Sequence, residues 1–328
     1  MTYDEKYMRR ALELARHGLG NTSPNPMVGA VIAGPDGRII GEGYHRRCGE
    51  GHAEVNAIAS VKDKGLLADS TIYVTLEPCS HYGKTPPCAK LIIDSKIPRV
   101  VVGAGDPFVA VAGRGIRMLR EAGIEVVEGV LADECRSLNR KFMTAHTLGR
   151  PYIALKWAQS ADGFIDSMQG PVKFSSALSS TLVHRLRSLY DAILIGSGTA
   201  LADHPRLDCR LWPGRSPRPV ILDRRHRVDV NALDMPVEPV VLSDFTDIDD
   251  ALRQLYKLGI SSVLVEGGAA VLQSFIDSGL WDIARIETAP IILGADGHTK
   301  APVLKNSKLL DTEEIGANTI KVYTRADQ

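Results

Sequence analysis

A histidine, a glutamate and two cysteines between residues 52 and 88 constrain this chain most strongly, because they must meet in space to act together. His52 and Glu54 stand two positions apart, and Cys79 and Cys88 follow. A catalytic zinc binds three protein ligands and keeps a fourth position for water, and one imidazole with two thiolates forms such a set. The stretch therefore predicts a catalytic zinc site with His52, Cys79 and Cys88 as ligands and Glu54 as the acid–base group for the water.

The spacing of this stretch matches the zinc-deaminase signature in its first half and departs from it in its second. The signature is His-x-Glu followed by Pro-Cys-x-x-Cys, whereas eight residues separate Cys79 from Cys88. Taken singly, each cysteine is more readily interpreted as a buried thiol. Taken together, a Pro78-Cys79 pair that closes the apolar run 71–76 and a His52 that opens a helix favour a metal site, since thiolates are stabilised at helix starts.

Length and charge limit the class of protein. A chain of 328 residues with 44% hydrophobic content predicts two domains. Lys plus Arg and Asp plus Glu are equal at 39 each, so there is no electrostatic argument for nucleic acid or an anionic membrane as a partner. We find no run of membrane-spanning length and no signal peptide, and five scattered cysteines favour metal binding and free thiols over disulfides. We therefore expect a cytoplasmic protein.

Apolar periodicity predicts an alternation of helices and strands in the first half, which is typical of a three-layer α/β domain. The pattern restarts at Gly149-Arg150-Pro151, where a helix must end, so we place a domain boundary between residues 148 and 149. In the first half we expect helices at 4–17, 89–94, 115–121 and 133–147 and strands at 27–33, 38–43, 71–76, 99–103 and 124–128. In the second half we expect strands at 151–158, 192–196 and 263–265 and helices at 178–190 and 269–278.

A glycine pair in the second half is a candidate phosphate site. The strand 263–265 is followed by Glu266-Gly267-Gly268 and then by the helix 269–278. Such a junction presents free backbone N–H groups and the positive end of a helix dipole to an anion. From the sequence pattern alone, a plain tight turn is the default interpretation of the two glycines. No Gly-x-Gly-x-x-Gly pattern occurs in this half, so a standard dinucleotide fold is not predicted.

The segments 22–29, 43–45, 52–54 and 76–88 together resemble the deaminase half of the bifunctional deaminase/reductase family of riboflavin biosynthesis, whose fold is similar to cytidine deaminase. The long cysteine spacing is that family's own variant. The resemblance implies hydrolytic removal of an amino group from a diaminopyrimidinone that carries a ribosylamino 5-phosphate. It also implies substrate contacts at four residues: Asn25, His45, His81 and Lys84. For His45, the sequence pattern alone is equally consistent with an ordinary polar loop residue.

The second half resembles the reductase half of the same family, whose fold is similar to dihydrofolate reductase. The matching positions are Lys156, segments 160–163, 198–207 and 266–268, and Arg210. The resemblance implies reduction of the ribose to an open ribityl chain by NADPH. It implies substrate contacts at Lys156, Arg187, Leu207, Arg210 and Glu266 and cofactor contacts at Thr199, Asp203, Gly267 and Gly268.

Two of these residues carry mechanistic hypotheses. Lys156 would polarise the ring-opened sugar, and Asp203 would hold either Lys156 or the cofactor ribose. For Arg187, a solvated helix face is the alternative, because basic residues late in a helix are favoured by its dipole.

The chain departs from the family pattern at two places. Segment 166–175 is short and lacks a tryptophan that many relatives carry, so contacts there cannot be transferred. Arg224 and Arg225 stand where many relatives have a small polar residue. An arginine beside the adenine-side ribose could bind a 2′-phosphate and favour NADPH over NADH, or it could be ordinary surface.

We thus expect a zinc-dependent pyrimidine deaminase domain at 1–148 and an NADPH-dependent reductase domain at 149–328. The resemblance implies two partners, namely a small phosphorylated pyrimidine and a second copy of the chain that is held through the reductase domain. A nucleic-acid deaminase would require a basic surface and short cysteine spacing, and it would not explain the second half. Decay of one half to a structural partner, or a non-enzymatic zinc module, remain as alternatives.

Overall fold

The computed structural model describes residues 1–81, 86–107 and 113–327. The chain divides into two compact units, Met1–Leu148 and Gly149–Gln328. Among the described residues, no helix combines the length and the apolar character that crossing a membrane requires.

The first unit is built on a five-stranded sheet with the order β2-β1-β3-β4-β5. β1 pairs antiparallel with β2 and with β3, and β3, β4 and β5 are parallel to one another. The predicted hairpin at the start of the sheet is therefore confirmed. The strands are β1 Gly29–Ala33, β2 Ile39–Tyr44, β3 Thr71–Leu76, β4 Arg99–Ala104 and β5 Glu125–Glu128.

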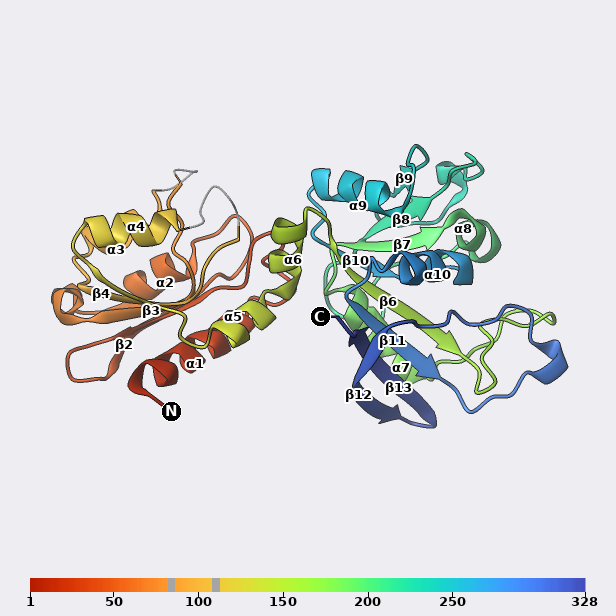
Figure 1. Ribbon diagram of the computed structural model, residues 1–328, viewed down its shortest axis with the longest axis horizontal. Coiled ribbons are helices and arrows are strands. Elements are labelled where there is room, and N and C mark those ends of the chain that lie inside the picture. The colour runs from red at the N-terminus through yellow and green to blue at the C-terminus, as the bar shows by residue number, and fades with distance from the viewer. Residues whose placement is uncertain (82–85, 108–112, 328) are drawn as a thin grey trace. The chain divides into compact units, whose positions relative to one another are not determined.

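Helices cover both faces of this sheet. Figure 1 shows α1 (Tyr3–Arg16) and α5 (Ala132–Leu138) on one face, and α2 (Ala53–Ser60), α3 (Cys88–Asp94) and α4 (Arg114–Glu121) on the other, while η1 spans Lys64–Asp69. Successive strand residues point to opposite faces. Accordingly, Tyr73 packs in the core under α1, and Ile72 and Val74 pack in the core under α2, α3 and α4. The predicted three-layer arrangement is confirmed.

The prediction of a single helix at 133–147 is wrong. The chain forms α5 and then α6 (Arg140–Leu148), with a break at Asn139. Asn139 Oδ1 accepts a hydrogen bond from the Met27 N–H, and Asn139 Nδ2 donates one to the Met27 carbonyl, both at 2.8 Å. The apolar spacing runs on through the break, but this side chain ties the backbone to a loop far away in the sequence.

The second unit is built on an eight-stranded sheet with the order β12-β13-β11-β6-β10-β7-β8-β9. From β11 to β9 all neighbours are parallel, and β13 is antiparallel to both β11 and β12. The strands are β6 Tyr152–Gln159, β7 Ala192–Gly196, β8 Arg218–Leu222, β9 Val240–Leu242, β10 Ser262–Val265, β11 Ile283–Thr288, β12 Ser307–Ile315 and β13 Asn318–Arg325.

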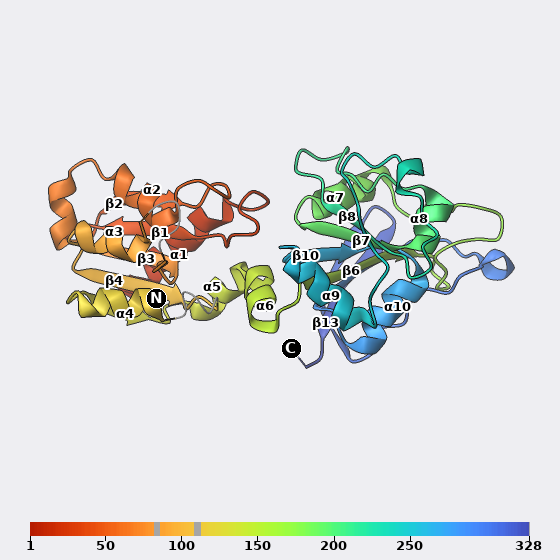
Figure 2. The same cartoon turned by 90° about the horizontal axis from the view of Figure 1, so that it is seen from above.

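This sheet also lies between two layers of helices. Figure 2 shows α7 (Ala177–Arg187) and α8 (Ser197–Asp203) on one face and α9 (Ile248–Lys257) and α10 (Ala269–Ser278) on the other. The core under α9 and α10 contains Leu155, Leu194 and Val265, and short 3-10 helices occur at η2 (Val230–Ala232) and η3 (Gly294–Asp296). Because the central strands are parallel, their carboxyl ends meet at one edge, where open α/β sheets bind ligands.

Candidate active sites

The first site lies where α2, α3 and the end of β3 meet. His52 is the N-cap residue of α2, Cys88 is the first residue of α3, and Cys79 follows β3 by three residues. His52 Nδ1 lies 3.3 Å from Cys88 Sγ and 3.6 Å from Cys79 Sγ. The potential ligand atoms of all three residues lie within 4.8 Å of one another. Ligands at about 2.0–2.3 Å from a tetrahedral zinc lie roughly 3.5 Å apart, so this donor set fits zinc.

The surroundings favour a thiolate at this site. The Cys88 N–H points at Cys79 Sγ across 3.3 Å. Hydrogen bonds from Cys88 and from His52 lower the pKa of Cys79 to about 4. Glu54, in the first turn of α2, is only 3% exposed, and its burial raises its pKa to about 7. A buried carboxyl group of this kind beside the metal ligands is suited to moving protons.

A cavity of about 380 Å³ opens onto these residues. Its walls include Asn25, His45 and His81, so the structure brings three of the four predicted substrate contacts to the same space as Glu54. The fourth, Lys84, lies outside the described residues. Two further wall residues, Phe142 and His146 of α6, were not predicted.

His45 is fixed in this cavity and is not an ordinary loop residue. It is 2% exposed, its Nδ1 lies 3.2 Å from the Gly51 carbonyl, and its Nε2 lies 3.3 Å from Asn25 Nδ2. Burial lowers its pKa. A neutral imidazole held at both ring nitrogens has a fixed position in the cavity wall, and it fixes the Asn25 amide beside it.

Glu77 is a further residue that was not predicted from the sequence. It precedes Pro78 and is 4% exposed, and its carboxylate accepts hydrogen bonds from the N–H groups of Gly113 and Gly115, both at 3.0 Å. A Cβ at Gly115 would lie 2.0 Å from the Pro78 carbonyl oxygen. These contacts fix the backbone immediately before Cys79. In the sequence, the feature that could have indicated this role is a single carboxylate directly after an apolar strand.

We expect Asn139→Ala to destabilise the first unit and to weaken substrate binding. The change removes two hydrogen bonds and leaves both backbone groups of Met27 without these partners, which costs about 2–3 kcal/mol of unfolding free energy. Asn25, two residues before Met27, would lose its position, so KM for the deamination expected from the sequence should rise. Urea denaturation and steady-state kinetics measure the two effects. Asn231→Ala, an exposed asparagine of the second unit, is the control, and an unchanged urea midpoint in Asn139→Ala would contradict this role.

The second site is a buried cluster of charges between the sheet of the second unit and α7. Arg187 on α7 forms a two-point ion pair with Glu266, which follows β10, at 2.7 and 3.1 Å. Burial lowers the pKa of Lys156 on β6, and the charges of Glu266 and Glu287 oppose that shift. Burial by itself would raise the pKa of Glu266, but the charges of Arg187 and Lys156 outweigh it and lower the value. Arg187 is therefore part of the site and not a solvated helix face.

Glu287 was not predicted and is fully buried. Glu287 lies on β11, beside β6. In this pair of strands Arg285 is opposite Lys156, and Glu287 is two residues further along β11, on the same face of the sheet. Its carboxylate accepts hydrogen bonds from Ser179 at 2.7 Å and from Ser175 at 2.9 Å, and also from Asn318 Nδ2. Burial opposes ionisation, but these hydrogen bonds lower the pKa of Glu287. Charged residues at alternate positions of an otherwise apolar strand were the available signal.

The loop after α8 joins the same cluster. Arg187 Nη1 donates to the Asp208 carbonyl at 3.1 Å, and Arg210 Nη1 donates to the Asp208 carboxylate at 2.6 Å. Leu207 is buried and has a φ of +52°, which is uncommon for a leucine and marks a constrained backbone. The predicted substrate contacts Leu207 and Arg210 are thus held to Arg187 through Asp208.

The predicted cofactor residues are brought together in part. A Cβ at Gly267 would lie 2.5 Å from Ile195 Cγ2, and a Cβ at Gly268 would lie 3.3 Å from Thr199 Oγ1. Gly268 also has a φ of +67°. Both glycines are therefore required where the start of α10 meets the start of α8. Asp203 is exposed at the end of α8, and the carboxylates whose charges act on Lys156 are Glu266 and Glu287, so the hypothesis that Asp203 holds Lys156 is not supported.

Comparison with known proteins identifies both halves. The model of the cytidine and deoxycytidylate deaminase zinc-binding region matches residues 1–104, and the model of the RibD C-terminal domain matches residues 151–321. Riboflavin biosynthesis protein RibD of Actinobacillus pleuropneumoniae is 36% identical over 98% of this chain and 95% of its own. RibD of Aquifex aeolicus is 39% identical over 89% of this chain and 88% of its own. This chain belongs to the RibD family.

A solved structure agrees with this assignment. A diaminohydroxyphosphoribosylaminopyrimidine deaminase/5-amino-6-(5-phosphoribosylamino)uracil reductase from Thermotoga maritima matches with a TM-score of 0.84 and 38% identity, over 98% of this chain and 99% of that one. As a member of the RibD family, the chain is a bifunctional deaminase and reductase of riboflavin biosynthesis, with zinc and NADPH as its cofactors. The predicted family, fold class, enzyme class and cofactors are confirmed.

Proposed function

We propose that residues 1–148 deaminate 2,5-diamino-6-(5-phosphoribosylamino)pyrimidin-4(3H)-one and that residues 149–328 reduce the product to 5-amino-6-(5-phosphoribitylamino)uracil with NADPH. The observation that carries the proposal is the meeting of His52, Cys79 and Cys88 beside the buried Glu54 at a cavity. The relative from Thermotoga maritima, which matches over nearly the whole chain, supports the same pair of reactions.

In the deaminase domain, His52, Cys79 and Cys88 would hold zinc. Bound zinc supplies a Lewis acid that makes water a nucleophile near neutral pH. Glu54 takes one proton from the attacking water and passes it to a nitrogen of the pyrimidine ring, and it then moves the second proton from the new hydroxyl group to the leaving amino group. A bond from the water oxygen to the ring carbon forms, the bond from that carbon to the amino nitrogen breaks, and ammonia leaves.

The cavity walls would hold the pyrimidine and its sugar phosphate. Asn25 and His45 present a linked pair of polar groups to the ring, and His81 lies at the exposed side of the cavity. Lys84 is the proposed partner of the 5-phosphate, because an ammonium group is a compact charge suited to phosphate. A phosphorylated small molecule would satisfy these groups, whereas a polynucleotide would need other contacts.

In the reductase domain, the charge cluster would hold the sugar of the deaminated intermediate. Bound NADPH supplies the hydride. Lys156 donates a hydrogen bond to the oxygen of the ring-opened sugar, and Glu266 fixes Arg187 so that its remaining N–H groups meet the substrate. Leu207 and Arg210 would complete the substrate contacts from the loop that Asp208 ties to Arg187.

The cofactor would lie along the starts of α8 and α10. Gly268 lies close to Thr199, and Gly267 lies close to Ile195. The backbone N–H groups at the start of the ten-residue helix α10 would bind the pyrophosphate there. Asp203 would contact the cofactor ribose from the end of α8. We further propose that the protein acts in the cytoplasm, where its five free cysteines would stay reduced.

Self-association is the last part of the proposal. β12 is an edge strand whose residues are almost all exposed, with Leu309 and Leu310 at 49% and 52%. An edge strand of this kind can pair with another chain. We therefore propose a homo-oligomer held through the reductase domain.

Removing the 5-phosphate from the substrate tests the proposed substrate class. We expect kcat/KM for ammonia release to fall about 10–100-fold with the dephosphorylated pyrimidine, since charge-assisted hydrogen bonds to phosphate contribute roughly 1.5–3 kcal/mol. Cytidine, which lacks both the phosphate and the second ring amino group, should release no ammonia. Equal turnover of cytidine and the phosphorylated pyrimidine would contradict the proposal.

A further inference from the structure

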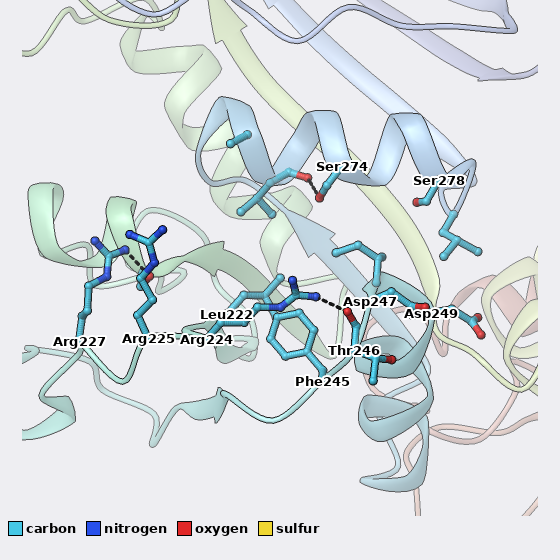
Figure 3. Close-up of a pocket in the computed structure, with 15 residues that line it drawn as sticks. Leu222, Arg224, Arg225, Arg227, Phe245, Thr246, Asp247, Asp249, Ser274 and Ser278 are labelled. Atoms are coloured by element: carbon cyan, nitrogen blue, oxygen red, sulfur yellow. Dashed lines mark hydrogen bonds between the residues drawn. The ribbon is translucent and has the colours of Figure 1, made fainter.

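A second cavity, of about 690 Å³, lies in the reductase domain at the carboxyl end of its parallel strands. Leu222, which ends β8, and Phe245, which follows β9, line the cavity (Figure 3). Ser197, which begins α8, lines it as well. Ligands of open α/β sheets bind at this end of the strands. Its size is in the range of small-molecule sites.

The walls of this cavity carry an excess of positive charge. Arg224, Arg225 and Arg227 all line it, together with Asp247 and Asp249. Both aspartates are engaged elsewhere on α9: Asp247 accepts a hydrogen bond from the Asp250 N–H at 2.9 Å, and Asp249 pairs with Arg253 at 2.8 Å. Within the described residues, neither aspartate forms an ion pair with any of the three arginines.

The arginines stand on a defined turn that Asp223 builds. Asp223 is 1% exposed, and its Oδ2 accepts hydrogen bonds from the N–H groups of Arg227 at 2.6 Å and Val228 at 2.8 Å. The His226 N–H donates to the Asp223 carbonyl at 3.2 Å, and His226 has a φ of +50°. The turn thus fixes where each arginine leaves the backbone, which reduces the cost of ordering them on a ligand.

The three arginines have different environments. Arg224 donates to the Thr246 carbonyl at 2.7 Å, and its guanidinium lies 4.3 Å from the centre of the Phe245 ring, so it forms a wall. Arg227 donates one hydrogen bond to Ser197 Oγ at 2.7 Å. For the Arg225 side chain we find no hydrogen bond or ion pair within the described part of the chain. Figure 3 shows Arg225 and Arg227 pointing in the same direction, while Arg224 turns toward Thr246.

We propose that Arg225 and Arg227 bind the 2′-phosphate of NADPH and thereby select NADPH over NADH. The inference rests on the proposed function, because it requires the cofactor's adenosine end to lie in this cavity. Two guanidinium groups on a fixed turn match a dianionic phosphate ester, which accepts several N–H hydrogen bonds, and gain little from the neutral hydroxyl of NADH. The sequence named Arg224 and Arg225 without separating them, and the Arg224 guanidinium is already held on Phe245, where it forms a flat surface against which an adenine can pack.

Binding of cofactor fragments to the full chain tests this proposal without any turnover. Isothermal titration should show that adenosine 2′,5′-bisphosphate binds at least about 30-fold more tightly than 5′-AMP, since the two differ only in the 2′-phosphate. We expect Arg225→Gln and Arg227→Gln each to weaken bisphosphate binding about tenfold. Binding of 5′-AMP should stay within about twofold in both variants.

Arg224→Gln is the matched control, because it removes the same charge from the neighbouring position. Arg224→Gln should weaken the binding of both nucleotides by the same factor and leave the ratio of their affinities unchanged. If Arg224→Gln alone abolished the preference for the bisphosphate over 5′-AMP, the proposal would be overturned. An unchanged ratio in the Arg225→Gln, Arg227→Gln double variant, whose folding is checked by circular dichroism, would also overturn it. A wild type that discriminates between the nucleotides but never oxidises NADPH would support this assignment and contradict the proposed reductase reaction instead.

Discussion

Glu54→Gln should lower kcat for ammonia release by about 1,000-fold, within the range that general acid–base groups contribute. Glutamine has nearly the same shape and keeps a hydrogen-bonding oxygen, but it cannot take a proton from water and return it to the leaving amino group. His52, Cys79 and Cys88 are unchanged in this variant, so the protein should still bind one zinc ion per chain. Ammonia release by a coupled assay and zinc content by elemental analysis measure the two properties.

The reductase domain supplies the internal control for Glu54→Gln. When the deaminated intermediate is given directly, NADPH oxidation should match the wild type, because Glu54 belongs to the other compact unit. A variant that keeps more than a tenth of the ammonia release while retaining zinc would show that Glu54 is not the proton carrier. Loss of zinc along with activity would instead assign Glu54 a role in holding the site together.

Lys156→Met should lower the rate of NADPH oxidation about 100–1,000-fold, the effect of removing one donor to a developing negative charge. Methionine fills a similar volume without the ammonium group, so the substitution removes the charge and the hydrogen bonds and keeps the packing on β6. The measurement is single-turnover oxidation of NADPH with the deaminated intermediate, which reports the reduction step and not product release.

Lys257→Met, at the exposed end of α9, controls for the loss of a lysine in the same domain. Ammonia release should be unchanged in both variants. If Lys156→Met kept near-normal reduction, Lys156 would not polarise the sugar, and the position of the carboxylates Glu266 and Glu287 near it would need another explanation. Binding of NADPH to the variant separates loss of reduction from loss of the cofactor.

The zinc site was predictable from sequence because short segments build it. His52 is the N-cap residue of α2, and Cys88 is the first residue of α3. Cys79 lies three residues after the end of β3, so local sequence patterns place each ligand at or near the end of an element. Period-two and helical spacing then predicted the hairpin and the alternating layers, since each side chain's face depends only on its neighbours in sequence.

The features that sequence reasoning missed depend on contacts between distant residues. Asn139 breaks a helix because it bonds to Met27, 112 positions away. Glu287 joins the reductase site because β11 lies beside β6, an order that the sequence does not reveal. Which of three neighbouring arginines is free follows from the Asp223 turn and from the position of Phe245, and not from the residue types.

The central claim is that one chain performs both reactions, and two signals from one sample test it most directly. The full chain is given the phosphorylated diaminopyrimidinone, with and without NADPH, and ammonia release and NADPH oxidation are followed separately. The account predicts ammonia in both cases and NADPH oxidation that lags behind it, with Glu54→Gln suppressing both signals and Lys156→Met suppressing only the second. Ammonia release by the wild type with no NADPH oxidation would contradict the bifunctional assignment.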